Sequence, residues 1–310
     1  MRNLLVFAFI IFGSMSLYAQ DDATEEATEE TEEEQNYWTK SASLGLNVTN
    51  VGFSTYWAGG GNPSLSVTGL VKANATYNKG AVTWLNTFEG GYGLVRQVDD
   101  YNNVLLRKSD DRIVAVSKWS KAFGESSWAF TALGDFRTQF TDGFTYTYVN
   151  EEPEATRISD LLAPGYLTLA AGGEYKPNDN LYIMASPVSG KVTFVMDEDL
   201  SNQSAFGVDS GSTIRTELGA IFNARYATSL MENISFETKI NLFQAYREGA
   251  MIDVMWDNLL EFKINDYFTS TFSTQLIYDE DVLFENPDSG EMEPHVQFKH
   301  VLNIGFLLRF

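Results

Sequence analysis

Hydrophobic residues recur at every second position near the C-terminal end of the chain, and polar residues take most of the positions between them. A β-strand turns successive side chains to opposite faces, so this pattern predicts a strand with one apolar and one mainly polar face. An apolar outer face and a terminal aromatic residue are typical of the last strand of an outer-membrane β-barrel. We interpret the apolar set as a barrel-insertion signal formed by Ile304, Phe306, Leu308 and Phe310.

The same alternation divides the rest of the chain into candidate strands. Most exceed the mean globular strand of about 5–6 residues and match a tilted membrane-crossing strand of about 9–11 residues with extensions. We therefore predict an all-β fold, an antiparallel transmembrane β-barrel of about twelve strands, with ten as the alternative because the first strand is weak. The predicted strands are 38–49, 64–77, 81–95, 111–122, 126–140, 165–176, 181–195, 212–228, 233–246, 251–265, 267–279 and 295–310.

Short and long connections alternate between these strands, with 247–250 as the one short exception among the long ones. Outer-membrane barrels place short turns in the periplasm and long loops outside, so we predict that both termini are periplasmic. The short connections are 78–80, 123–125, 177–180, 229–232 and the junction at Asp266. The long connections are 50–63, 96–110, 141–164, 196–211 and 280–294.

Charged residues share one parity within several strands and so share one face. A charge facing lipid near the membrane midplane costs roughly 2–4 kcal/mol, which predicts that these faces line the lumen. In a narrow barrel, opposed charges favour a plug of paired side chains, while a thin conduit for a small polar solute would use the same residues. Both interpretations stay open. The lumen candidates are Arg215, Glu217, Arg225, Glu237, Lys239, Asp253, Asp257, Glu261, Lys263 and Arg309.

Two strands interrupt the regular pattern. Pro187 and Gly190 lie inside 181–195, and because proline donates no backbone hydrogen bond we expect a bulge or a break there. The strand 111–122 carries four consecutive apolar residues from Ile113 and does not choose a face cleanly.

The N-terminal residues predict export. Arg2 precedes a short apolar run and small residues lead to Ala19, which is the pattern of a secretory signal peptide over 1–19. Residues 20–36 follow as a predicted disordered acidic periplasmic tail, because 21–35 hold nine acidic residues and no basic one. Residues 37–310 form the predicted barrel, which places the protein in the outer membrane of a Gram-negative cell.

A glycine-rich run and several acidic clusters fall in the predicted loops. The run Trp57, Gly59, Gly60, Gly61 and Asn62 is either a flexible extracellular turn or a contact for a ligand or partner. The clusters at 110–111, 151–154, 197–199 and 279–281 favour solvation and diffuse bridging to lipopolysaccharide through divalent ions, since none has the spacing of a calcium loop.

The composition argues against several function classes. The chain has no cysteine, which excludes disulfides and thiol chemistry, and its net charge of −21 with no basic stripe argues against nucleic acid. The two histidines, His295 and His300, are five residues apart and face opposite sides of one strand. We therefore predict no catalytic residue, no metal site, no cofactor and no enzyme activity.

Residues near the start of the predicted barrel resemble a known family. They are Phe53, Trp57, 59–62 and 64–66, followed by 77–80, Trp84, Asn86 and 91–93. This stretch is similar to the Gram-negative proteins grouped as domain of unknown function 3078. The resemblance implies a signal-bearing outer-membrane barrel and assigns no catalytic or binding residue.

Two functions follow as hypotheses. The first is a small-solute channel or transport-related barrel whose lumen charges set selectivity. The second is a structural or assembly subunit of an outer-membrane complex that binds its partner through the outer loops or the acidic tail. The expected contacts are outer-membrane lipid and lipopolysaccharide, with the barrel-insertion machinery as a partner during biogenesis.

Overall fold

The computed structural model describes residues 36–51, 64–98, 103–150, 152–285 and 290–309, and the chain from Tyr37 onward forms one compact unit. The predicted signal peptide, nearly all of the acidic tail, the Trp57 to Asn62 run and Phe310 lie outside the described residues. The barrel strands are β1 (Trp38–Val51), β2 (Ser64–Lys79), β3 (Val82–Val98), β4 (Val104–Ala122), β5 (Trp128–Thr138), β8 (Gly165–Tyr175), β9 (Leu181–Phe194), β10 (Ile214–Met231), β11 (Ile234–Ala245), β12 (Ile252–Lys263), β13 (Phe268–Tyr278) and β16 (Gln297–Arg309).

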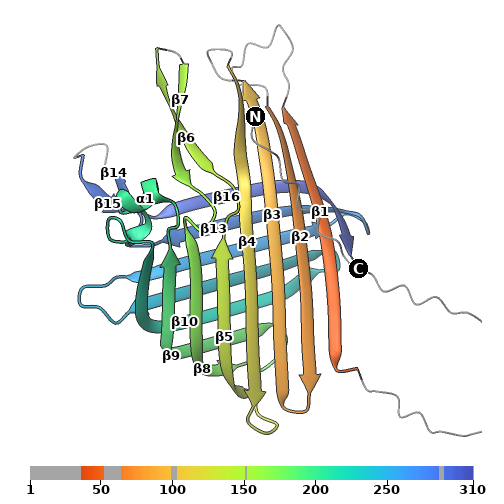
Figure 1. Ribbon diagram of the computed structural model, residues 1–310. Coiled ribbons are helices and arrows are strands. Elements are labelled where there is room, and N and C mark those ends of the chain that lie inside the picture. Colours follow the sequence, from red (N-terminus) through yellow and green to blue (C-terminus); the bar gives the residue numbers. More distant parts are fainter. Residues whose placement is uncertain (1–35, 52–63, 99–102, 151, 286–289, 310) are drawn as a thin grey trace, which may run out of the picture. The chain divides into compact units, whose positions relative to one another are not determined.

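These strands pair in the closed order β1-β16-β13-β12-β11-β10-β9-β8-β5-β4-β3-β2, and every neighbouring pair is antiparallel (Figure 1). The predicted twelve-stranded antiparallel barrel is confirmed, and the ten-strand alternative is wrong. Closure matters physically because it leaves no sheet edge with unpaired backbone groups. The first strand, which was weak as a pattern, pairs with β2 along its whole length.

The connections differ at the two ends of the barrel. At one end, short turns join β2 to β3, β4 to β5, β8 to β9, β10 to β11 and β12 to β13; we call this the turn end. At the other, which we call the loop end, three connections carry structure of their own in the described residues, namely those between β5 and β8, β9 and β10, and β13 and β16. These added elements are β6 (Gly143–Val149), β7 (Glu152–Ser159), α1 (Glu198–Asn202), η1 (Ala205–Gly207), β14 (Leu283–Glu285) and β15 (Met292–Pro294).

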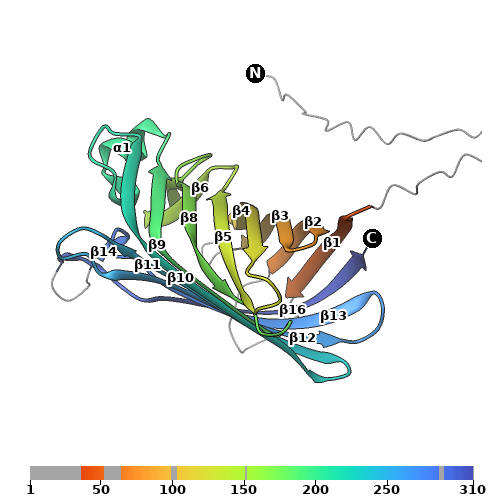
Figure 2. The same ribbon diagram turned by 90° about the horizontal axis from the view of Figure 1, so that it is seen from below.

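Two of these additions correct the expectation of plain loops. Strands β6 and β7 form a separate two-stranded sheet inside 141–164, and it stands apart from the barrel wall at the loop end (Figure 1). In the connection between β9 and β10, Val195, Leu200 and Val208 are buried in a small apolar cluster with Ala163. Figure 2 shows α1 of this connection at the end of β9. That cluster anchors the connection against the loop end of β8 and β9.

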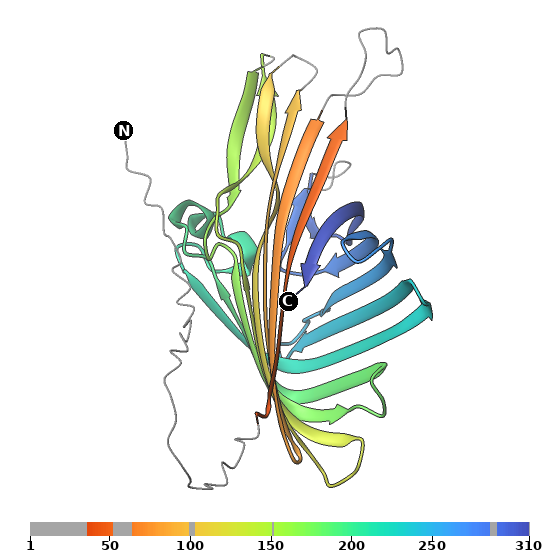
Figure 3. The same cartoon turned by 90° about the vertical axis from the view of Figure 1, so that its right-hand side faces the viewer.

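The outward face of the barrel strands is apolar. Leu302, Ile304 and Phe306 of β16 are exposed, and so are their neighbours on the adjoining strands, because register pairs Leu46 with Phe306 and Phe272 with Leu302. The adjoining strands repeat this arrangement with exposed Leu44, Val48, Val67, Phe88, Trp119, Phe130, Leu169, Leu218, Phe222 and Trp256. Figure 3 shows the barrel from the side of β1 and β16.

The bulge predicted in β9 is confirmed. The register against β10 shifts between Ser186 and Ser189, so that Pro187 and Val188 have no partner on β10, while Val188 still pairs with Ala171 of β8. The hydroxyl of Ser186 lies 2.7 Å from the carbonyl oxygens of both Ala171 and Val188, so its single proton is shared between two backbone acceptors at the bulge. Across the sheet, a side chain at Gly172 would lie 2.1 Å from the carbonyl oxygen of Ala185, so the backbone approach there requires glycine.

Buried apolar side chains lie inside the barrel next to this bulge. Met184 is fully buried and packs with Ala170, Ile221, Phe243 and Ala245 from four strands between β8 and β11. We call this group the apolar layer.

Among the described residues, no helix is both long enough and apolar enough to cross a membrane.

Candidate functional site: the charged barrel interior

A cluster of ion pairs occupies the interior near the loop end. Lys191 of β9 places its Nζ 2.8 Å from Asp253 of β12 and 3.5 Å from Asp279, which follows β13. Strands β9 and β12 are separated in the wall by β10 and β11, so these side chains reach toward each other through the interior. The side chains of all three residues are largely buried.

The segment 279–281 is held by three cationic side chains. Besides Lys191, Arg215 of β10 contacts Asp281 at 2.6 Å, and Arg247 contacts Glu280 at 2.5 Å. The same Glu280 accepts a hydrogen bond of 2.9 Å from the backbone amide of Met251. We call Lys191, Arg215, Arg247, Asp253 and 279–281 the loop-end cluster. The expectation that this acidic run is free to be solvated is therefore wrong, because the fold supplies a cation for each carboxylate.

Two of the sequence-predicted lumen residues, Arg215 and Glu217, lie together in this region. They are two positions apart on the same face of β10 and pair at 2.6 Å. Arg215 thus bridges carboxylates on two different elements, Glu217 in the wall and Asp281 in the connection. Its Nη1 also donates a hydrogen bond of 3.3 Å to the carbonyl oxygen of Gly207 in η1.

The apolar layer separates this cluster from the turn end along the β9 to β11 wall. Lys191 lies 5.5 Å from the ring of Phe243, so the apolar layer begins directly beside the ion pairs. Met184 is the residue of the apolar layer nearest the turn end. Its register partner on β10 is Asn223, and the register partner of Asn223 on β11 is Asn241. This region of the interior therefore changes from charged to apolar to polar along the strands.

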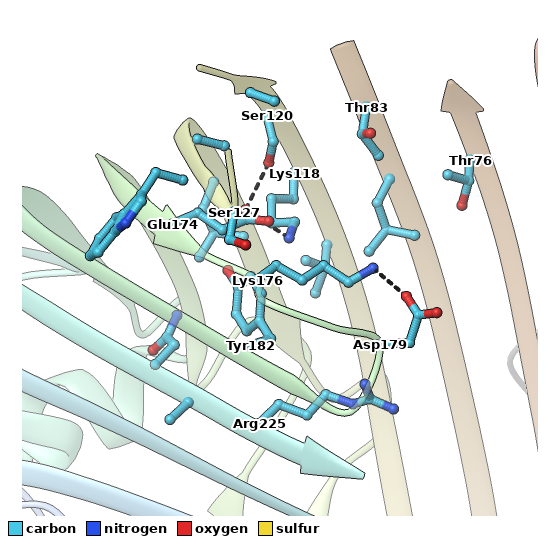
Figure 4. Close-up of a pocket in the computed structure, with 18 of the residues that line it drawn as sticks. Thr76, Thr83, Lys118, Ser120, Ser127, Glu174, Lys176, Asp179, Tyr182 and Arg225 are labelled. Atoms are coloured by element: carbon cyan, nitrogen blue, oxygen red, sulfur yellow. Dashed lines mark hydrogen bonds and ion pairs between the residues drawn. The ribbon is translucent and has the colours of Figure 1, made fainter. Parts of the chain in front are cut away.

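A cavity of about 610 Å³ opens in the interior at the turn end (Figure 4). Its residues come from β2, β3, β4, β5, β8, β9, β10 and β11, so it reaches across the barrel rather than lying in one wall. We call it the turn-end cavity. Its charged lining residues are Lys118, Asp135, Glu174, Lys176, Asp179, Arg225 and Lys239.

One wall of the cavity holds a buried hydrogen-bonded network. Glu174 of β8 accepts from Lys118 at 3.0 Å and from the hydroxyl of Ser120 at 2.8 Å, and Ser120 in turn lies 3.0 Å from the hydroxyl of Thr131. The ammonium of Lys118 also lies 4.1 Å from the ring centre of Tyr182, at cation–π distance. The buried carboxylate therefore has a cation and a hydroxyl as partners at its Oε2, as a charge in a low-dielectric interior requires.

Sequence reasoning missed Lys118 and Glu174. Lys118 lies in the strand whose consecutive apolar residues concealed its faces, and Glu174 is the single charge in a strand of small residues. The signal that could have found Lys118 is its parity opposite Trp119, an aromatic residue exposed on the outer face.

The opposite wall carries three of the predicted lumen residues. Arg225 of β10 and Lys239 of β11 are cross-strand partners, and both contact the carboxylate of Glu237. The Nε of Arg225 donates to Glu237 at 2.7 Å, and the Nζ of Lys239 lies 2.6 Å from its other oxygen. Two cations thus share one carboxylate on this wall.

Three further ion pairs or hydrogen bonds tie interior strands together. Arg137 and Asp135 of β5 pair at 2.8 Å, and the Nη1 of Arg137 lies 3.1 Å from the sulfur of Met255 in β12, which is distant in the wall. Asp257, another predicted lumen residue, accepts a hydrogen bond of 2.7 Å from Gln275. Asp257 also lies opposite Lys239 in the register of β11 and β12.

The remaining predicted residues do not join either site. Lys263 pairs at 2.8 Å with Asp266 in the exposed turn between β12 and β13, and Glu261 lies opposite Thr271 and Ser235 near the same rim. Arg309 is paired in backbone register with Ser43, while its side chain lies outside what the structure describes.

The described residues include no group of three histidine, aspartate or glutamate side chains arranged to hold a metal ion. His295 lies 3.2 Å from Glu293 in the β14 to β16 connection, and His300 lies opposite Thr274 in the wall, so the two histidines remain apart. The absence of enzyme activity and of a cofactor stays a prediction.

Comparison with known proteins gives one family match. The family described as "Protein of unknown function (DUF3078)" matches residues 48–144. The residues from Phe53 to Gly93 that carry the resemblance in the sequence fall inside this match, so the resemblance is confirmed for that part of the chain. No curated protein matches the chain.

Several solved structures are similar in architecture. An outer-membrane channel from Pseudomonas putida F1 is 10% identical with a TM-score of 0.39, covering 87% of this chain and 94% of that one. The translocator domain of the autotransporter NalP from Neisseria meningitidis is 10% identical with a TM-score of 0.42, covering 90% of both chains. The NanC porin is 6% identical with a TM-score of 0.40, covering 87% and 97%. At these scores, none of the likenesses bears on what this chain does.

Proposed function

We propose that the protein is an outer-membrane barrel that conducts a small polar solute between its turn end and its loop end. The observation that carries the proposal is the turn-end cavity, a charged space of about 610 Å³ that reaches across the interior of a closed barrel. A purely structural barrel has no need for a polar cavity of this size, whereas small-molecule sites commonly enclose about 300–1,000 Å³.

The outer face supports insertion in a membrane. Exposed Leu302, Ile304 and Phe306 alternate along β16 with Asn303 and Gly305 on the inner face, and Trp256 and Leu218 are likewise exposed on other strands. Exposing apolar surface to water costs about 25 cal/mol per Å² of that surface. Contact with the hydrocarbon of a membrane removes this cost. The orientation we propose has the turn end and both chain ends on the periplasmic side.

The loop-end cluster then acts as the constriction of the conduit. Its ion pairs join β9, β10, β12 and the connections at the loop end through the interior. Ion pairs that span a lumen restrict the space through which a solute passes, and their charges select what enters. Passage requires these side chains to separate or to leave a gap beside them.

Single-channel recording in planar bilayers tests this proposal. The purified protein should show discrete conductance steps, and Asp281→Ala should raise the conductance because it frees Arg215 and Arg247 from one of their carboxylates. Asp266→Ala is the matched control, since it also removes an aspartate from an ion pair but in the exposed turn at the other end. Its conductance should equal that of the wild type.

Two outcomes would overturn the conduit. The first is an ion-tight barrel in both the wild type and Asp281→Ala. The second is an equal rise in conductance for Asp281→Ala and Asp266→Ala, which would assign the change to a general loosening of the fold. The electrophoretic mobility of unheated samples establishes that each variant is folded.

A second candidate is a structural or assembly subunit of an outer-membrane complex. The observation that favours it is the β6–β7 hairpin, which lies outside the barrel wall and exposes Phe144, Val149 and Ile158. An apolar surface on a projecting hairpin fits a protein partner at the loop end. Crosslinking in intact cells should recover a stoichiometric partner through this hairpin, and monomers in every preparation would argue against the candidate.

A further inference from the structure

We propose that the turn-end cavity is a binding site for a small organic anion with an apolar body, such as a monocarboxylate. This inference rests on the proposed function, because it takes the cavity as the entrance of the conduit. It adds the chemical class of the solute that the conduit would carry. It is carried by the charge that the cavity wall presents, by free hydrogen-bond donors beside that charge, and by an apolar surface next to both.

The accessible charges of the cavity are mainly positive. The side chains of Arg225 and Lys239 are 40% and 42% exposed, while the carboxylate of Glu237, which they share, is 23% exposed. Across the cavity the carboxylate of Glu174 is 7% exposed beneath Lys118 and Ser120. The cationic groups therefore face the space, and these carboxylates lie behind their partners.

Two other carboxylates complete the lining. Asp135 is 17% exposed and is occupied by Arg137. Asp179 is the exception, being almost fully exposed in the turn between β8 and β9, where it pairs with Lys176 at 3.0 Å (Figure 4). At the rim, solvent screens that pair far more than the interior groups. An entering solute thus meets its strongest uncompensated charge at Arg225 and Lys239.

Free donors surround this positive wall. Arg225 uses its Nε and Nη2 on Glu237, which leaves Nη1 without a partner among the described residues. One row deeper, the side-chain amides of Asn223 and Asn241 lie opposite each other and line the same cavity, and neither donates to another described residue. A guanidinium and two amides can together donate hydrogen bonds to both oxygens of a carboxylate.

The rest of the lining is apolar and selects the body of the ligand. Leu85, Val116 and Leu133 line the cavity from β3, β4 and β5, across from the β10 to β11 wall. Tyr182, from β9, adds an aromatic face that lies beside Lys118. A solute that carries one carboxylate on a compact hydrocarbon body would satisfy both sides of the cavity, whereas an inorganic anion would leave the apolar side in contact with water.

Calorimetric titration of the detergent-solubilised full-length protein tests the inference. The probes are benzoate, benzamide and benzylamine, which share one shape and differ in charge. Benzoate should bind at least about tenfold more tightly than benzamide, because a charge-assisted hydrogen bond is worth about twice a neutral one, and benzylamine should bind most weakly. Equal binding of benzoate and benzamide, or tighter binding of benzylamine, would overturn the inference.

Variants of the shared carboxylate and its cations should shift benzoate affinity in opposite directions. Glu237→Gln leaves Arg225 and Lys239 without their carboxylate and should tighten benzoate binding several-fold. Arg225→Gln with Lys239→Gln should weaken it by about tenfold or more. Lys263→Gln is the matched control, since it removes a cation from an ion pair at the exposed rim, and should leave affinity unchanged.

The opposite signs keep the test sharp, because a variant that merely destabilises the barrel loses affinity whichever charge it removes. Weaker binding to Glu237→Gln would therefore contradict the site. Calorimetry is also independent of conductance. Benzoate binding in a barrel that conducts no ions would leave the site standing without the conduit, while a conducting barrel with no preference for benzoate would remove the site and keep the conduit.

Discussion

At the scale of single residues, the interior is organised by side chains that serve more than one element. Arg215 contacts Glu217 in its own strand, Asp281 in the connection after β13 and the carbonyl oxygen of Gly207 in η1. Removing one partner of such a buried group leaves an uncompensated charge and costs about 3–5 kcal/mol. Individual residues of the loop-end cluster therefore hold together chain segments that share no strand pairing.

Asp197 plays a comparable part outside the barrel. Its carboxylate accepts a hydrogen bond of 2.8 Å from the backbone amide of Leu200 at the start of α1 and one of 2.7 Å from Arg157 of β7. The bond from the Leu200 amide is the chief reason that the pKa of Asp197 is lowered below its ordinary value of 3.8, and the Arg157 guanidinium lowers it further. The charged form thus links the β9–β10 connection to the β6–β7 hairpin.

A pH dependence follows with a definite sign. Because the pKa of Asp197 is depressed in the folded state, the contact is fully present above pH 3.8 and is lost as the pH falls through the lower folded value. Hydrogen exchange of 197–203, corrected for the intrinsic pH dependence, should show protection at pH 5 that is lost only as the pH falls below 3.8. Asp197→Ala should lose the protection already at pH 5, and Glu198→Ala should keep it. Full protection of Asp197→Ala would contradict the assignment.

At the scale of the strand, alternation sets which side chains meet lipid. In β16, Leu302 is 69% exposed on the outer face opposite Phe272, while Asn303 lies on the inner face opposite Thr271. Adjacent residues of one strand thus experience different solvents. The bulge at Pro187 changes this parity within β9, so that Met184 and Ser186 before it and Ser189 and Lys191 after it all pair with inward positions of β10.

This contrast predicts unequal effects of the same substitution on neighbouring residues. Leu302→Lys should lower the free energy of unfolding in lipid vesicles by roughly 2–4 kcal/mol, because the ammonium faces hydrocarbon near the middle of the strand. Asn303→Lys, the control one position along, should change it by less than about 1 kcal/mol, because its side chain faces the polar interior. Urea titration followed by tryptophan fluorescence measures both. Equal losses would contradict the assignment of the faces.

At the scale of the whole molecule, closure depends on one short seam. Strand β1 is paired with β2 over its entire length but with β16 only between Ser43 and Asn47. Every barrel strand other than β1 and β16 is held on both sides by a longer ladder. The seam completes the cylinder, and without it β1 and β16 would present unpaired backbone groups to hydrocarbon.

A disulfide across the seam tests closure, because the chain has no cysteine of its own. Asn47 and Gly305 are cross-strand partners, and a side chain at Gly305 would point at Asn47. Asn47→Cys with Gly305→Cys should therefore crosslink under mild oxidation, visible as a shift in electrophoretic mobility that a reductant reverses.

The register supplies the control for this experiment. Ser43→Cys with Gly305→Cys keeps both residues on the inner face, but Ser43 is partnered by Arg309 rather than by Gly305. That pair should stay uncrosslinked. Crosslinking of both pairs would show that the seam slides, and crosslinking of neither would show that the barrel is open.

Much of the wall could be predicted from the sequence. The alternation that ends in Leu302, Ile304 and Phe306 identified an outer face, and all twelve predicted strands coincide with strands of the barrel within a few residues, except that β4 begins at Val104 rather than at 111. Hydrocarbon on one side of the wall and a polar interior on the other favour alternating apolar and polar residues along a strand. This alternation can be recognised in the amino-acid sequence alone.

The contacts inside the barrel needed the tertiary structure. Parity predicted Asp253 on the inner face, but Lys191 was not predicted and Asp279 was expected in a solvated loop. Only the closed arrangement of twelve strands brings β9 within reach of β12 and of the segment after β13. The β6–β7 hairpin was also missed, because 141–164 was expected to be a loop, although Phe144, Tyr146 and Tyr148 alternate with threonines in β6. Solvent contrast is a local property of each residue, whereas pairing across a lumen depends on how the whole wall curves and closes.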